Sequence, residues 1–112
     1  MAAGGGGLMA GYLAAEVPAV LERTMSATPA EFLRCLQIAL PAGSIDRIHA
    51  GGCRVCADGL ELLLDWTPAG ERRIGLLALP QLRVRYRFVK GDADTRAHFL
   101  ARLDRAMQRG GG

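Results

Sequence analysis

Two cysteines and a histidine are the residues most able to do chemistry at short spacing. Cys53 and Cys56 form a Cys-x-x-Cys pair, and His49 lies four residues before it. Such a pair holds zinc or forms a disulfide only when both thiols reach one point. In a regular strand, residues three positions apart point to opposite faces, and no second ligand pair of comparable spacing occurs. The sequence therefore predicts no metal site and no cofactor, with Cys53 in the core and Cys56 exposed.

A cysteine nucleophile is the alternative use of these residues. The thiol would need a base within hydrogen-bond distance. His49 could approach Cys53 if Gly51 and Gly52 fold the chain back, and Asp46 could then orient the imidazole. No serine motif and no glycine-rich phosphate loop supports an enzyme. We expect a protein that is not an enzyme, and a thiol-dependent enzyme is the least favoured hypothesis.

The strongest functional pattern is a strand in which apolar residues alternate with arginines. Residues 82–89 read Leu-Arg-Val-Arg-Tyr-Arg-Phe-Val. Successive side chains on a strand point to opposite faces, so Arg83, Arg85 and Arg87 point outward while their apolar neighbours face a core. Thirteen of the fourteen lysines and arginines are arginine, which suits bidentate anion contacts and ion pairs. A GC-rich genome explains the same bias without any binding role.

Further basic residues extend this pattern. Arg73 is expected outward on a neighbouring strand, and four basic residues recur at helical spacing in residues 93–109. The first of these four is His98. The predicted anion-binding or partner-binding residues are therefore Arg73, Arg83, Arg85, Arg87, Arg102, Arg105 and Arg109.

An apolar set is expected on the same outward face. Leu63, Gly75 and Leu77 would lie in the middle of two central strands, where a solvated sheet more often carries polar residues. An apolar patch rimmed by charges is typical of an interface with a protein partner or a second copy of the chain. The segment 8–21 could instead cover this patch.

The expected register keeps carboxylates away from the arginine strand. Asp65 would lie opposite Arg73, and Glu61 would share a row with Leu77 and Arg83. At two strand spacings the carboxylates would screen the arginines without pairing with them. The arginines of residues 82–89 would then form a positive stripe.

Nucleic acid is the alternative ligand of that stripe. Sheets that bind single strands place aromatic residues among the cations so that bases stack. Here Trp66, Tyr86 and Phe88 are expected on the core side. Phosphate-backbone recognition is therefore the form of nucleic-acid binding that stays open, and the favoured hypothesis is a protein-interaction module using the outward face.

The remaining elements follow from local signals. Thr28-Pro29-Ala30-Glu31 predicts a capped helix to about Leu40. Strands are predicted at 45–57 with a break at the paired glycines, then at 60–66, 72–79 and 82–89, with a hairpin turn at Asp58-Gly59. The last helix starts after Gly91. The fold class is α+β, a four-stranded antiparallel β-meander with an N-terminal and a C-terminal helix packed on one face.

Length and charge limit the number of domains and the class of protein. The 112 residues, half of them hydrophobic, suffice for one domain with a core. Residues 1–27 are expected to be a flexible or partly helical extension, with a weak helical pattern over 8–25; residues 28–109 form the domain and 110–112 a disordered tail. The net charge of +3 arises in the second half. Three cysteines, with no charged leader before them, favour a reducing cytoplasm. We expect a bacterial, cytoplasmic protein that does not bind a membrane.

Overall fold

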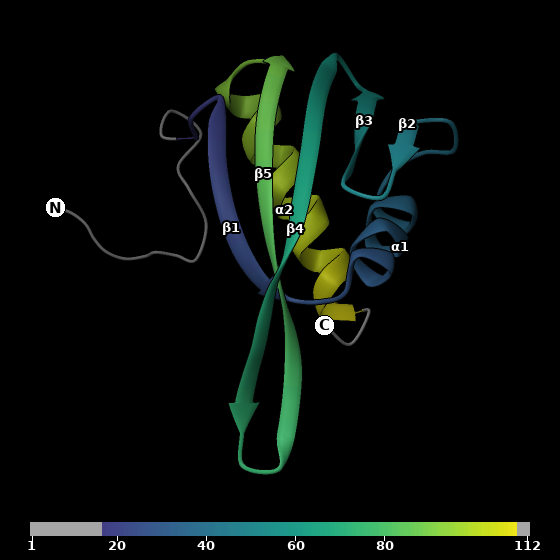
Figure 1. Cartoon of the computed structure of the whole chain (residues 1–112). Coiled ribbons are helices and arrows are strands. Elements are labelled where there is room, and N and C mark those ends of the chain that lie inside the picture. The colour runs from purple at the N-terminus through teal and green to yellow at the C-terminus, as the bar shows by residue number, and fades with distance from the viewer. Residues whose placement is uncertain (1–16, 110–112) are drawn as a thin grey trace, which may run out of the picture.

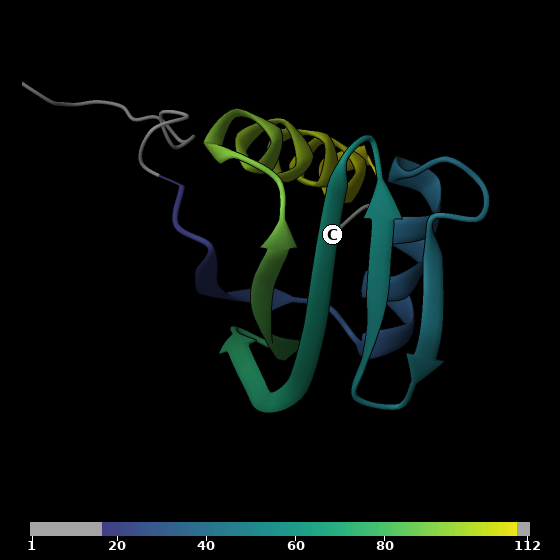
Figure 2. The same ribbon diagram turned by 90° about the horizontal axis from the view of Figure 1, so that it is seen from above.

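The structure, a computed structural model, describes residues 17–109. In these residues a five-stranded antiparallel sheet has the order β1-β5-β4-β3-β2, and two helices pack on one of its faces (Figure 1, Figure 2). The α+β class and the antiparallel sheet are confirmed. The elements in chain order are β1 (Val20–Ser26), α1 (Pro29–Ala39), β2 (Ile45–His49), β3 (Gly52–Ala57), β4 (Leu60–Ile74), β5 (Leu77–Lys90) and α2 (Ala93–Arg109).

The prediction of four strands is wrong, because the segment before α1 adds a strand. Residues 20–26, expected to be extension or helix, form β1 and pair along β5 from Val20 opposite Arg87 to Ser26 opposite Gln81. Their side chains alternate between exposed and partly buried positions, which is a strand period that the weak helical pattern obscured. The sheet is therefore not a simple meander, since its first strand lies next to its last. Residues 1–16 and 110–112, which include the expected tail, lie outside the described part.

The predicted strand at 72–79 is also wrong. β4 continues through the expected loop at 67–71, and the chain reverses at Gly75, whose φ is +59°. The pairing between β4 and β5 shifts between Pro68 and Glu71, so these turn-forming residues make an irregularity in a long strand without ending it. Residues 71–80 consequently form a two-stranded ribbon that projects from the body, called the arm below (Figure 1).

The hairpin between β3 and β4 has the predicted register. Asp58 and Gly59 form its turn, with φ of +50° and +78° as a type I′ turn requires. Cys53 lies opposite Leu64, and Val55 lies opposite Leu62. All four are buried. This places the hairpin's apolar side against the helices and its charged side away from them.

The helices close the core. Thr28 Oγ1 accepts a hydrogen bond from the Glu31 backbone N–H at 3.1 Å, and the Glu31 carboxylate accepts one from the Thr28 N–H at 2.9 Å, so α1 begins with a capping box. Phe32 of α1 meets Trp66 edge to face with ring centres 5.6 Å apart. Phe99 of α2 meets Phe88 in the same way at 6.1 Å. Both helices therefore cover the same face, as predicted.

Candidate functional site

The sheet face away from the helices, called the outward face below, carries the arginines of β5. Tyr86 and Val84 are fully buried, whereas Arg83, Arg85 and Arg87 between and beside them are exposed. The alternation predicted for this strand is therefore present. Because β5 lies between β1 and β4, its arginines occupy the middle of the face and not an edge.

The observed register brings a carboxylate to the arginine strand. Asp65 lies opposite Arg85, not opposite Arg73, because β4 is the direct neighbour of β5. Its carboxylate is 3.5 Å from the Arg87 guanidinium, and both side chains are about half exposed. The expectation that two strands separate these charges is wrong, and part of the predicted positive stripe is neutralised. An exposed pair of this kind contributes little to stability.

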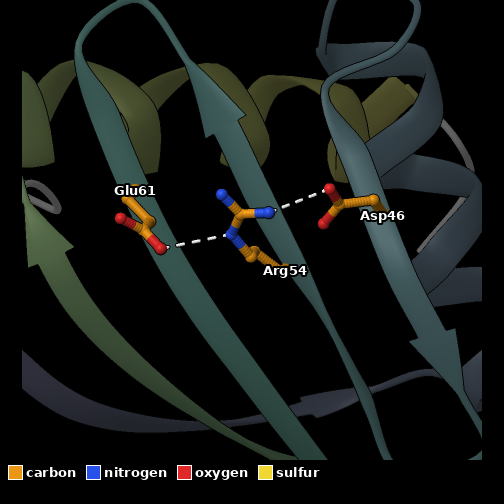
Figure 3. Close-up of polar contacts among 3 residues, drawn as sticks. All are labelled: Asp46, Arg54 and Glu61. Atoms are coloured by element: carbon orange, nitrogen blue, oxygen red, sulfur yellow. Dashed lines mark hydrogen bonds and ion pairs between the residues drawn. The ribbon is translucent and has the colours of Figure 1, made fainter.

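A second carboxylate is held by an arginine that the sequence analysis did not single out. Arg54 of β3 lies between Asp46 of β2 and Glu61 of β4, with contacts of 3.0 Å and 3.1 Å (Figure 3). These bonds to Glu61 and Asp46 raise the pKa of Arg54, the hydrogen bond with Glu61 being the largest cause. Glu61 therefore does not share a row with Leu77 and Arg83. The signal in the sequence was the position of Arg54, which the Asp58-Gly59 hairpin sets opposite Leu63 and therefore diagonal to Glu61 on the same face.

The two remaining β5 arginines keep most of their charge for a ligand. No hydrogen bond or ion pair within residues 17–109 is made by the side chains of Arg83 and Arg85. Arg83 has Thr24 and Thr67 as its cross-strand neighbours, and Arg85 has Glu22 and Asp65. Arg83 is thus the least compensated cation at the centre of the outward face.

The arm carries three of the seven large apolar residues that are exposed in the described chain, among them the most exposed one. Leu76 is fully exposed, Leu77 is 61% exposed and Ile74 is 50% exposed. Arg73 also lies here, with its guanidinium 3.8 Å from Glu71. The arm begins where β4 and β5 leave the body (Figure 1). Arg83 and Arg85 follow its last residue, Pro80, by three and five positions along β5.

The predicted apolar set does not form one patch. Leu63 lies in the body of the sheet opposite Arg87, whereas Gly75 and Leu77 lie at the far end of the arm. Sequence reasoning placed all three in central strands because it ended β4 too early. The strand expected at 72–79 would also place Ile74 and Leu76 on the core side, which is wrong: both are exposed, because the turn falls at Gly75.

The helix stripe is less concentrated than predicted. Arg102 of α2 is 3.5 Å from Asp58 in the β3–β4 turn. Arg105 is exposed, and Arg109 ends the helix, with its side chain outside the described part. His98 Nδ1 lies 2.9 Å from the backbone oxygen of Asp94. These residues occupy a helix on the opposite side of the sheet from the β5 arginines, so they do not extend the outward face.

The cysteines do not converge on a ligand. Cys53 is buried and faces the core, where burial raises the pKa of its thiol to about 11. Cys56 is partly exposed beside Glu61, and all three cysteines are free. His49 lies next to Gly52, and its one ring hydrogen bond within residues 17–109 is to the Gly51 backbone N–H and not to a cysteine. Within residues 17–109, no cluster of three or more His, Cys, Asp or Glu side chains could hold a metal.

Comparisons with known proteins do not place the chain in a family. No protein-family model matches the sequence, and no curated protein is significantly similar to it. Among the helices of residues 17–109, none has the length and apolar character needed to cross a membrane.

Proposed function

We propose that the protein is a non-enzymatic binding module that engages a protein partner through the arm and the adjoining arginines of the outward face. The observation that carries the proposal is the exposure of Ile74, Leu76 and Leu77 at the end of a projecting ribbon. An exposed Leu or Ile side chain releases about 1.5 to 3 kcal/mol when fully buried. Three such residues in one place give a partner most of the apolar contact that a small interface centre needs.

The arm has few contacts of its own that would stabilise it. Its strands pair from Glu71 opposite Pro80 to Ile74 opposite Leu77, and every residue of 71–80 except Leu79 is exposed. A two-stranded ribbon without a packing surface is marginally stable in water. Binding of a partner over the arm would therefore also stabilise the ribbon.

Charges around the arm suit the rim of such an interface. Arg72 and Arg73 flank the apolar end, and Arg83 and Arg85 follow the arm along β5. Arginine is enriched in protein interfaces, where it combines apolar contact with bidentate pairing to carboxylates. The partner surface that fits is apolar in the middle and acidic around it.

Nucleic acid is the second candidate, and the projecting basic ribbon is the observation that favours it. A two-stranded ribbon fits the major groove of a duplex, and some ribbons place apolar wedges between base steps. In residues 17–109, the aromatic rings of Trp66, Tyr86 and Phe88 are all buried, so these rings offer no stacking surface for a single strand. Duplex binding through phosphates is the form this alternative takes.

Co-purification from cells of the source organism tests the proposal. The full chain is compared with the double variant Leu76→Asp and Leu77→Asp and with the control Ile38→Asp, which changes a 61% exposed residue of α1. We expect the chain and the control to retain the same protein in stoichiometric amount, and the double variant to lose it. Equal retention by all three would contradict the proposal.

Salt dependence separates the two candidates. Binding of the chain to a duplex oligonucleotide is measured by fluorescence anisotropy between low and physiological salt. Nucleic-acid binding predicts an affinity that falls steeply with salt, and the slope becomes shallower by about one for each phosphate-contacting arginine removed. Absence of duplex binding at low salt leaves the protein-partner proposal alone.

A further inference from the structure

A depression in the outward face lies where the β2–β3 hairpin meets β4 and β5. Its volume is about 260 Å³, which is below the range of about 300 to 1,000 Å³ typical of drug-sized ligands. The size fits one small group and not a nucleotide. Its lining includes Arg47, His49, Arg54, Leu63, Asp65 and Arg87.

Gly52 lies next to two residues of this lining, His49 and Asp65, and has no room for a side chain. A Cβ at this position would overlap the backbone oxygen of Leu64 and would lie 3.2 Å from His49 Nε2 and 3.3 Å from the Asp65 carboxylate. The imidazole and the carboxylate therefore stand over a backbone without a side chain. A larger residue at position 52 would therefore displace the Leu64 backbone and crowd both side chains.

The hydrogen bonding of His49 defines which nitrogen can donate to a ligand. Its Nδ1 accepts a hydrogen bond from the Gly51 backbone N–H at 3.2 Å. A nitrogen that accepts in this way carries no proton, so the proton of the neutral ring is on Nε2. That N–H faces the space above Gly52, where it has no acceptor at hydrogen-bond distance among residues 17–109.

Of the three arginines in the lining, Arg47 and Arg87 are available to bind a ligand, whereas Arg54 is not. Arg54 is occupied by Asp46 and Glu61. Arg87 has a single contact of 3.5 Å with Asp65, and Arg47 has no ion pair or side-chain hydrogen bond within the described residues. Arg47 also has a φ of +53°, a left-handed conformation that non-glycine residues adopt at a cost of about 1 kcal/mol. This conformation falls where the pairing of β2 with β3 shifts, between Asp46 and His49.

We propose that this depression binds a phosphate group, with Arg47 and Arg87 as its charge partners and His49 Nε2–H as a third donor. Guanidinium groups bind phosphate through paired N–H donors, and an imidazole N–H adds a bond from another direction. Asp65 is the one carboxylate of the lining and competes with the ligand for Arg87. The site uses residues of the body of the sheet and none of the arm, so it stands or falls independently of the proposed function.

Titration of the full chain with inorganic phosphate, followed by two-dimensional NMR at constant ionic strength, tests the site. We expect saturable shifts at the Gly51 and Gly52 amides in the millimolar range, with sodium chloride giving none. The variant Arg47→Asn removes the charge but keeps a residue that tolerates the left-handed conformation. It should weaken binding at least about tenfold.

Two further variants sharpen the result. Asp65→Asn frees Arg87 and should tighten phosphate binding, whereas Arg105→Ala removes an exposed arginine of α2 and should leave it unchanged. Shifts that do not saturate, or that persist equally in Arg47→Asn, would overturn the proposal. A parallel titration with O-phosphoserine identifies the source: tighter binding of phosphoserine assigns the site to a phosphorylated molecule, and tighter binding of inorganic phosphate assigns it to the free ion. Failure of both ligands to bind refutes it.

Discussion

At the scale of the residue, the two thiols of the Cys-x-x-Cys pair have different environments. Cys53 is 4% exposed, and burial raises the pKa of its thiol to about 11. Cys56 is partly exposed on the other side of β3. The thiolate is the reactive form, so a buried thiol of raised pKa reacts slowly.

Alkylation therefore distinguishes the cysteines. With iodoacetamide at pH 8 and without denaturant, mass spectrometry should find Cys56 modified well before Cys53 or Cys35. The variant Cys56→Ser should remove the fast phase. Equal rates for Cys53 and Cys56 would show that the thiols share one environment and would contradict the described β3.

Tyr86 predicts how stability depends on alkaline pH. Burial raises its pKa to about 12, with Asp104 adding to the rise and Arg23 opposing it. The phenol of an unfolded chain has a pKa of about 10. Because the folded chain favours the neutral phenol, this contribution to stability is complete below pH 10 and is lost as pH rises to 12.

The measurement is urea unfolding of the wild-type chain and Tyr86→Phe at pH 8 and pH 11. The wild-type chain should lose about 1 kcal/mol more than the variant between these pH values, because pH 11 lies one unit above the pKa of the unfolded phenol. An identical loss in both would mean that Tyr86 ionises as freely in the folded chain as in the unfolded one.

At the scale of the element, the start of α1 depends on one hydroxyl. Thr28 caps the helix by accepting the Glu31 N–H. Thr28→Ala should lower the free energy of unfolding by about 1 kcal/mol, whereas Thr28→Ser, which keeps the hydroxyl, should lower it much less. Chemical denaturation measures both, and equal losses would argue against the cap.

The arm should be the least protected strand pair. All of its residues except Leu79 are exposed and none belongs to the core, so local opening costs little free energy. Hydrogen exchange at residues 71–79 should be much faster than at residues 84–88, where β5 is buried in the sheet. Comparable protection in both halves of β5 would show that the isolated arm is already covered.

Elements with strong local signals were predictable from the sequence. The capping box of α1, the Asp58-Gly59 turn and the alternation of residues 82–89 each depend on residues close in sequence, and the structure contains all three. The candidate arginines of β5 followed from that alternation. Their exposure was therefore foreseeable, although their partners were not.

Long-range pairing was not predictable in the same way. β1 is a strand because it pairs with β5, some sixty residues later, and its own pattern is weak. Pro68 and Gly70 usually mark a loop, yet the paired strand carries β4 past them as an irregularity. Because the prediction ended β4 before Pro68, it gave Asp65 the wrong cross-strand partner and misplaced the apolar set.

At the scale of the whole molecule, the chain divides into a packed body and a projecting arm. The body holds the buried residues of both helices and the sheet, and the arm holds none of them. Leu62→Ala in the body should cost about 2 to 5 kcal/mol of unfolding free energy. Leu76→Asp on the arm should change it by no more than about 0.5 kcal/mol.

This difference distinguishes the residues that stabilise the fold from those that are available to bind a partner. Residues that stabilise the chain lie between the helices and the sheet, whereas the exposed apolar residues of the arm do not serve the fold. A large loss of stability in Leu76→Asp would show that the arm belongs to the packed structure, and the proposed docking role would lose its basis.

The most direct test of the docking role is photo-crosslinking in cells of the source organism. Benzoylphenylalanine replaces Leu76 in the full chain, and a second version carries it at Ile38 of α1 as the control. The proposed function predicts one or a few discrete protein adducts from position 76 and none from position 38; an adduct of twice the chain's mass would identify the partner as a second copy. No adduct from position 76, the same adducts from both positions, or an adduct that nuclease digests would contradict it.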